Sequence, residues 1–272
     1  MGIKPQSHHW ETISSHWRNV GCPLRPCPDD IENYTKLIDP HGGEAIRALI
    51  FGVTPELYHL AWPAGSTVHS VDRSSAMIKA IWPGPAESAT NADWLDMPFP
   101  DESFDCVLCD GGLTLLEYPR SQQVLSATLA RVLRRRGQFI SRLFANPDQS
   151  EKPAAVLSDL GAGNIPSVHI LKLRLAMALQ RSAESGIVLE HVFETIIREF
   201  GSLDGLHAST GWPQGEVSTL SSYYLSKDRY HFFTRQQAIE VLTTGGGLVF
   251  ERAIESSYPL GERCPFLSFR KV

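Results

Sequence analysis

Acidic residues follow three predicted strands of this chain, each where a strand gives way to a turn. Asp72 ends a strand over 67–72, Asp93 follows the next strand, and Asp110 follows the strand over 104–109. Ligands of open parallel sheets bind beyond the carboxyl ends of the strands, where a carboxylate can accept both hydroxyl hydrogens of a ribose diol. Asp72 suits that role, and Asp93 could accept from an adenine amino group. Each carboxylate alone could instead cap a helix or shape a turn, but their shared order and spacing favour a binding site.

Neighbours of these carboxylates are the other binding candidates. Trp94, next to Asp93, offers a stacking face or a backbone N–H. Backbone contacts are expected from Gly52, Val53, Thr54 and Gly111. Glycine at such turns lets the chain approach a ligand closely.

Short apolar runs that end in turns predict the strands that position these residues. The runs lie at 46–52, 67–72, 104–109 and 138–144, with helical patterns between them. This alternation predicts βαβ units and a mostly parallel sheet. The basic run Arg134–Arg136 follows a helical pattern, so we expect it at a helix C-terminus, where cations are favourable.

Helical patterns flank this core on its N-terminal side and follow it. Residues 8–20 predict an amphipathic helix, and a second short helix ends near Leu37 with Asp29 or Asp30 as its cap. Residues 153–200 also predict helices.

The last part of the chain begins with an expected polar loop that includes residues 208–216. Thr234 and Gln237 form a capping box that opens a helix to about Leu242. Two closing strands are expected after it.

Composition is that of an ordinary globular protein. The 272 residues are 42% hydrophobic and 20% charged, with a formal net charge of −5, which disfavours nucleic acid as a partner. No apolar run is long enough to span a membrane, and the N-terminus lacks the apolar core of a signal peptide. We therefore expect a cytoplasmic protein, a monomer or homodimer, with no membrane partner.

Five scattered cysteines suit reduced thiols. Cys106 and Cys109 lie in a predicted strand and should point to opposite faces, which disfavours a shared metal or redox pair. His9, Cys22 and Cys27, with the adjacent His8, match no standard zinc-finger spacing. No metal site is expected.

Residues 46–144 resemble the core of class I S-adenosylmethionine-dependent methyltransferases. The stretch ADWLDMPFPDESFDCVLCDGGLTLL resembles the family pattern GDAxxLPFxDxSFDxVxxxxxL, and VHSVDRSSAMI and ARVLRRRGQFISRLF resemble its second-strand and fifth-strand motifs. The resemblance implies a Rossmann-like, doubly wound, mostly parallel seven-stranded α/β sheet with an antiparallel last strand. It implies S-adenosyl-L-methionine as cofactor, S-adenosyl-L-homocysteine as product, Asp72 as the ribose ligand, Met77 against the adenine, and Arg73 as a further cofactor-binding residue.

The first loop departs from the family pattern. The family has G-x-G-x-G, whereas GVTPE keeps Gly52 and replaces the next two glycines by Thr54 and Glu56. Glu56 would repel the carboxylate of the cofactor's methionine moiety but could meet its ammonium group. Arg25 is the candidate partner of that carboxylate, because guanidinium pairs with it in a bidentate manner; otherwise Arg25 is a surface residue. Either cofactor binding is weakened or lost, or other residues complete the pocket.

Candidate general bases come from the C-terminal part. His231 has a suitable unperturbed pKa, and Tyr230 precedes it; Glu262 is a third candidate. A structural histidine before a helix cap is the alternative reading of His231. Asp110 could bind cofactor or acceptor, or only shape its turn.

The leading function is methyl transfer to a small-molecule acceptor by in-line displacement. A silent or regulatory cofactor-binding domain, aminocarboxypropyl transfer and cyclisation of the cofactor remain open. A nicotinamide-dependent dehydrogenase would require G-x-G-x-x-G after the first strand, and GVTPEL does not supply this motif. We expect one domain, 1–272, with an N-terminal helical lid (1–40), a cofactor-binding core (41–150), a helical insertion (151–215) and a closing segment (216–272).

Overall fold

A seven-stranded sheet forms the centre of the computed structural model, which describes residues 8–38 and 44–272. Its strands are β1 (Arg47–Phe51), β2 (Thr67–Asp72), β3 (Ala89–Asn91), β4 (Phe104–Asp110), β5 (Leu133–Arg142), β8 (Leu248–Ile254) and β9 (Phe266–Lys271). The strand order is β3-β2-β1-β4-β5-β9-β8; β9 pairs antiparallel with both β5 and β8, and the other neighbouring strands pair parallel. The expected Rossmann-like sheet is confirmed. Its order reverses between β1 and β4, which is where such sheets bind ligands.

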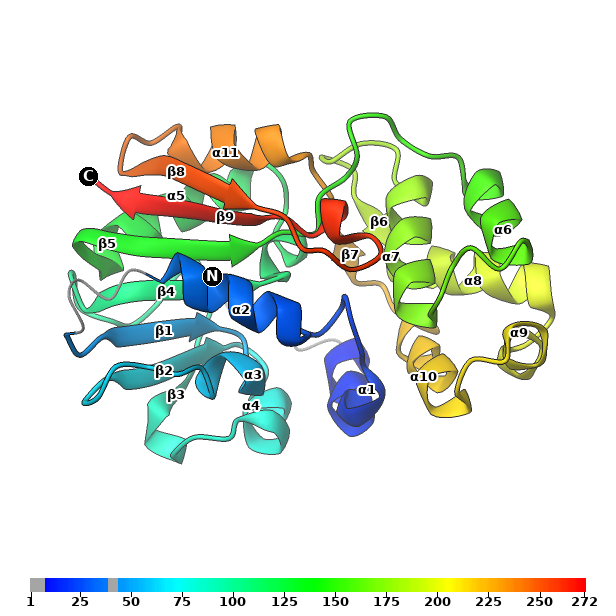
Figure 1. Cartoon of the computed structure of the whole chain (residues 1–272), viewed down its shortest axis with the longest axis horizontal. Helices are drawn as coiled ribbons and strands as arrows, with labels where there is room; N and C mark the ends of the chain where they lie inside the picture. The colour runs from blue at the N-terminus through cyan, green and yellow to red at the C-terminus, as the bar shows by residue number, and fades with distance from the viewer. Residues whose placement is uncertain (1–7, 39–43) are drawn as a thin grey trace.

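Helices cover both faces of this sheet (Figure 1). They are α2 (Pro28–Leu37), α3 (Pro55–Tyr58), α4 (Ser75–Ile81), α5 (Arg120–Val132) and α11 (Arg235–Thr243). Successive strand residues alternate between the two cores, since Leu49 packs with the α5 and α11 side and Ile50 with the α2 side. Cys106 and Cys109 also belong to different cores, as expected.

A helical insertion lies beside the carboxyl ends of the parallel strands (Figure 1). It contains α6 (Pro153–Gly161), α7 (Val168–Leu179), β6 (Ile187–Val188), α8 (Leu189–Phe200), α9 (Leu203–Thr210), α10 (Gln214–Ser218), a 3-10 turn η4 (Thr219–Tyr223) and β7 (Arg229–Tyr230). The insertion has its own apolar core. The expectation of a loop over residues 208–216 is wrong, because α9 and α10 occupy most of it; Ser202 caps α9 by accepting from Gly205 N–H.

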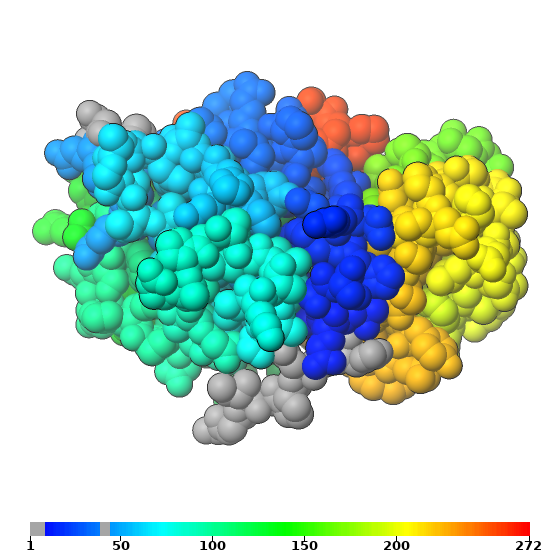
Figure 2. Space-filling model, turned by 90° about the horizontal axis from the view of Figure 1, so that it is seen from below, coloured from blue at the N-terminus to red at the C-terminus, as the bar shows by residue number. Residues whose placement is uncertain are grey.

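Helix α1 (His8–His16), continued by a 3-10 turn η1 (Trp17–Asn19), joins the two parts. It packs against α4 on the sheet side and against η4 on the insertion side. Figure 2 shows its dark-blue residues between the cyan residues of the sheet part and the yellow and orange residues of the insertion. The helix thus bridges the gap beyond the strand ends.

Two local expectations are wrong. Arg134–Arg136 lie in β5, not at a helix C-terminus, because α5 ends at Val132 and Leu133 already pairs with Phe104 of β4. The expected cap of α2, Asp29 or Asp30, does not precede the helix, because the residue before α2 is Cys27. Asp30 is the third residue of the helix, and its side chain accepts the Cys27 N–H at 3.0 Å.

Among the helices of residues 8–38 and 44–272, we find none with the length and apolar character needed to span a bilayer. The expected segment boundary at residue 40 lies outside the described residues.

Candidate active site

A cavity opens at the carboxyl ends of the parallel strands, between the sheet, α1 and the insertion. It encloses about 1230 Å³ of space, a volume that includes the solvent in its mouth. The candidates that line it are Gly52, Val53, Thr54, Asp72, Arg73, Met77, Asp93, Trp94, Asp110, Gly111 and Tyr230. Thus the structure brings most of the candidate residues together, whereas His231 and Arg25 are not part of the lining.

Asp72 presents a poorly solvated carboxylate to this cavity. Its Oδ1 accepts the N–H of Ser74 at 2.6 Å. Burial raises the pKa of Asp72 to about 6, although the backbone N–H groups of Ser74 and Val53 and the charge of Arg73 favour its ionised form. A carboxylate in this condition gains from further donors, and the hydroxyl groups of a ribose would supply them.

The backbone conformation of the first loop requires glycine at position 52. Its φ is +82°, and its N–H donates to the Val71 carbonyl at 2.9 Å. A Cβ there would lie 3.7 Å from Oδ2 of Asp72, so the constraint is the left-handed backbone and not a lack of space. Thr54 precedes α3 and Pro55 opens it, so the divergent loop still ends in a helix.

Arg25 and Glu56, the two candidates for the cofactor's amino-acid end, form an ion pair with each other. The guanidinium also lies over the Trp17 ring, 5.2 Å from its centroid. Oε2 of Glu56 and Nε1 of Trp17 are buried and have no hydrogen-bond partner within the described residues. Trp17 lines the cavity, whereas Glu56 does not, so the unused donor of Trp17 is at the cavity wall.

Asp93 and Trp94 shape the strand-end turn beside the cavity. Oδ1 of Asp93 accepts the Leu95 N–H at 2.9 Å. The Trp94 indole N–H donates to the Val71 carbonyl at 2.7 Å, and its ring stacks on Phe51 with centroids 5.4 Å apart. Trp94 therefore serves the packing of the loop, whereas Asp93 has its second oxygen left for a ligand.

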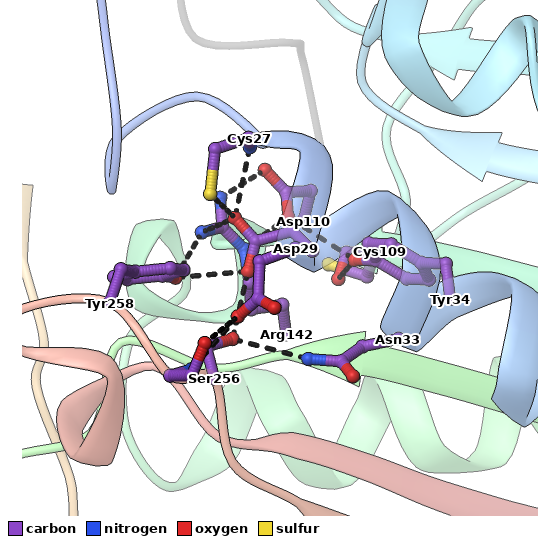
Figure 3. Close-up of polar contacts among 11 residues, drawn as sticks. Cys27, Asp29, Asn33, Tyr34, Cys109, Asp110, Arg142, Ser256 and Tyr258 are labelled. Carbon is purple, nitrogen blue, oxygen red and sulfur yellow. Dashed lines mark hydrogen bonds and ion pairs between the residues drawn. The ribbon is translucent and has the colours of Figure 1, made fainter.

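Asp110 is held in a buried ionic network (Figure 3). Its two oxygens accept from Nε and Nη2 of Arg142 at 2.6 and 2.9 Å. Nη1 of Arg142 donates to Asp30 at 2.8 Å and to the Tyr258 hydroxyl at 2.9 Å, and Tyr34 donates to Asp110 at 3.2 Å. Because Asp30 belongs to α2, this network fixes the N-terminal segment to the sheet. The Asp110 carboxylate is neutralised by Arg142, which favours a structural role.

Tyr230 and His9 form a polar pair on the insertion side of the cavity. The Tyr230 hydroxyl lies 3.0 Å from Nε2 of His9, and Nδ1 of His9 lies 3.1 Å from the Ser222 carbonyl. A carbonyl only accepts, so Nδ1 carries the proton and Nε2 accepts from Tyr230. Burial lowers the pKa of His9 to about 4, so the ring is neutral.

His231, the neighbour of Tyr230, has a different environment. Its Nδ1 bonds to the Ala183 carbonyl at 2.8 Å, and its backbone N–H donates to the Thr114 carbonyl at 2.8 Å. It is buried and absent from the cavity lining. These contacts support the structural reading of His231, and Glu262 is exposed.

Sequence reasoning missed His9 and Lys172 as cavity residues. His9 was considered only as a metal ligand. Lys172 could have been recognised from the sequence, because it is the single lysine of the mostly apolar helix VHILKLRLAMAL.

Cys22, Cys27 and Asp30 place possible ligand atoms within 4.8 Å of one another. Asp30 already accepts from Arg142, Tyr258, Ser256 and the Cys27 N–H. Burial raises the pKa of both thiols, which opposes the thiolate form that binds metals.

Comparisons with known proteins agree with this geometry. Residues 51–141 match the family model of the methyltransferase domain. No curated protein matches the chain in sequence.

Solved structures share the fold at low identity. A Rhodobacter sphaeroides protein, provisionally named a Zn-dependent alcohol dehydrogenase, has 16% identity and a TM-score of 0.64, covering 99% of this chain and 100% of that one. The N-methyltransferase NodS from Bradyrhizobium japonicum, in complex with S-adenosyl-L-homocysteine, has 14% identity and a TM-score of 0.50, covering 96% and 98%. A Listeria monocytogenes S-adenosylmethionine-dependent methyltransferase has 15% identity and a TM-score of 0.50, covering 90% and 98%.

Residues 51–141 match the methyltransferase domain model, and the strand order and the strand-end cavity are those of the Rossmann-like fold of class I S-adenosylmethionine-dependent methyltransferases. The cofactor of this class is S-adenosylmethionine. Asp72 and Trp17 line the cavity, and the indole N–H of Trp17 has no hydrogen-bond partner within the described residues.

Proposed function

We propose that this chain transfers a methyl group from S-adenosylmethionine to a small-molecule acceptor inside the cavity. The observation that carries this proposal is that one cavity is lined both by the strand-end residues Asp72 and Gly52 and by an apolar group of residues that includes side chains of α1. Trp10, Ile13 and Leu116 belong to that apolar group. One end suits a nucleoside and the other a small apolar molecule, so both reactants would lie in one space.

The cofactor end would be held by the strand-end residues. Asp72 would accept from the ribose hydroxyls, and Asp93 and Met77 would lie at the adenine. Arg25 and Glu56 form an ion pair with each other. To bind the amino-acid end of the cofactor, Arg25 would turn part of its guanidinium to the cofactor's carboxylate, and Glu56 would turn an oxygen to its ammonium group. The S-adenosyl-L-homocysteine bound to the Bradyrhizobium neighbour supports this assignment by analogy of fold.

Methyl transfer by in-line displacement mainly requires alignment of the two reactants and exclusion of water. When bound, S-adenosylmethionine supplies a methyl group on a positively charged sulfur. Tyr230 would orient the acceptor, because its proton points to His9 and its oxygen offers lone pairs to the cavity.

Helix α1 and the insertion would form the lid over the acceptor. His9, Trp10, Ile13 and Trp17 of the N-terminal segment line the cavity directly. A monomer or homodimer in the cytoplasm remains our expectation.

A cofactor-binding domain without catalysis is the second candidate. It is favoured by the pairing of Glu56 with Arg25, which occupies the groups otherwise expected to bind the cofactor. Aminocarboxypropyl transfer and cyclisation would use the same cofactor end.

Incubation with S-adenosylmethionine and pools of small hydroxyl, amine, thiol and carboxyl compounds tests the proposal. Mass spectrometry should detect S-adenosylhomocysteine together with an acceptor heavier by one methylene. Methylthioadenosine instead would indicate aminocarboxypropyl transfer or cyclisation. Cofactor binding without any product across the pools would favour the silent domain.

A further inference from the structure

Lys172 is a buried cation in the cavity wall to which methyl transfer as proposed gives no role. It lies on α7 with 2% of its surface exposed and lines the cavity. Its Nζ donates to Oγ1 of Thr219 at 3.0 Å and lies 5.0 Å from the centroid of the Tyr223 ring. Thr219 uses one of the three donors of an ammonium group.

The side chains that Lys172 contacts directly, Thr219 and Tyr223, supply no negative charge, and the charge of Asp228 acts on the neighbouring His9. Oγ1 of Thr219 must accept from Nζ, because the threonine hydroxyl donates to the Glu216 carbonyl at 2.6 Å. His9 is neutral, and burial raises the pKa of Tyr223 above its usual range. Within residues 8–38 and 44–272, no carboxylate forms an ion pair with Lys172.

Three carboxylates line the cavity, but they lie at the ends of strands of the sheet and interact with other groups. Asp110 is bound in a bidentate manner by Arg142. Asp72 and Asp93 lie at the ends of β2 and β3, on the side that we assign to the cofactor. The other cation of the lining, Arg73, is exposed and follows Asp72 directly. Lys172 is therefore a cation of the acceptor side without a counter-charge.

A buried ammonium without a counter-charge is unfavourable, and burial lowers the pKa of Lys172 to about 7. An anion that enters the cavity would supply the missing charge and hold the lysine in its protonated form. Tyr223 lies beside the ammonium group, and the aromatic side chains of Trp10 and Phe144 line the same cavity. A ligand that fits both features has an apolar or aromatic body and an anionic group.

We propose that the acceptor is a small aromatic acid whose carboxylate pairs with Nζ of Lys172. This inference rests on the proposed function, because it names the acceptor of that same cavity. Lys172 is then the residue that selects the substrate, while Asp72 and its neighbours hold the cofactor.

Calorimetric titration of three aromatic acids and their neutral amides tests the pairing. Benzoate, phenylacetate and 3-phenylpropanoate are each compared with the matching amide, with S-adenosylhomocysteine at saturation. We expect at least one acid to bind wild-type protein roughly ten- to a hundredfold more tightly than its amide. Lys172→Met should abolish this preference, whereas Lys79→Met, at an exposed position of α4, should keep it.

The inference is overturned if wild-type protein prefers no acid over its amide, including the case in which no acid binds, or if the preference survives in Lys172→Met. The methionine variant should fold, because an apolar side chain of similar length replaces a desolvated charge; Lys172→Gln serves if it does not. S-adenosylhomocysteine is titrated into every variant first. If S-adenosylhomocysteine does not bind wild-type protein, the proposed function is contradicted. A preference for the acid that depends on Lys172, measured in the absence of S-adenosylhomocysteine, still supports the inference.

Discussion

The Tyr230 hydroxyl donates to Nε2 of His9 at 3.0 Å, joining residues that are 221 positions apart in the chain. The contact ties α1 to β7 across the cavity. It also commits the hydroxyl proton to His9, so the phenol oxygen is left to accept from a bound acceptor.

Tyr230→Phe removes that acceptor atom and keeps the ring. If Tyr230 orients the acceptor, turnover should fall by about ten- to a thousandfold, while the dissociation constant of S-adenosylhomocysteine changes less than about threefold. Tyr224→Phe is the matched control, since Tyr224 is exposed. Equal turnover of the two variants would show that the Tyr230 hydroxyl has no part in the reaction.

Asp72 makes cofactor binding dependent on pH. Its pKa of about 6 in the folded protein means that the carboxylate becomes protonated as pH falls below 6. If the ribose requires the carboxylate, affinity for S-adenosylhomocysteine should fall between pH 7 and 5, by up to about tenfold per pH unit below the pKa. Calorimetry over this range measures it, and a constant affinity would be inconsistent with the role of Asp72.

The same carboxylate should cost stability in the ligand-free protein. A pKa raised above the unfolded value of 3.8 means that the folded state binds more protons, so this group stabilises the fold as pH falls from about 6 towards 4. Asp72→Asn removes the ionised form. We expect it to raise the melting temperature at pH 7 while weakening S-adenosylhomocysteine binding; a lower melting temperature would mean that the carboxylate supports the loop.

Arg25 should distinguish ligands with and without the amino-acid end. Arg25→Met is expected to weaken S-adenosylhomocysteine by about tenfold or more, because a charge-assisted contact is lost. Methylthioadenosine lacks that end and should bind both proteins alike. A similar loss for both ligands in competition titrations would assign Arg25 to the scaffold around Trp17.

Arg142 is expected to matter for stability more than any surface arginine. Arg142→Met leaves the buried carboxylates of Asp30 and Asp110 without their counter-charge, which should cost about 3–5 kcal/mol of unfolding free energy. Arg134→Met removes only the partly exposed pair with Asp105 and should cost at most about 1 kcal/mol. Urea unfolding of both variants measures the difference, and comparable losses would contradict this ranking.

The sheet was predictable because its strands are short apolar runs that end in turns. The same periodicity placed Asp72 beside Gly52, since neighbouring parallel strands end at one edge. Arg134–Arg136 were misplaced because pairing with β4 outweighs the local helical pattern. Local sequence contains no information on that pairing.

The acceptor side was less accessible to sequence reasoning. His9 and Lys172 come from α1 and α7, and only the packing of the insertion against the sheet brings them to the cavity. Tyr230 and His231 were both candidates, but successive residues of an extended segment point to opposite sides. Tyr230 alone lines the cavity, while His231 bonds to Ala183.

Calorimetric titration of purified protein with S-adenosylmethionine, repeated with Asp72→Ala, tests the central claim most directly. We predict binding at micromolar concentration to wild-type protein and binding weakened by about tenfold or more in the variant. A melting scan should show stabilisation of about 2.7 kcal/mol at a ligand concentration a hundred times the dissociation constant. No binding of either S-adenosylmethionine or S-adenosylhomocysteine at millimolar concentration would contradict the account.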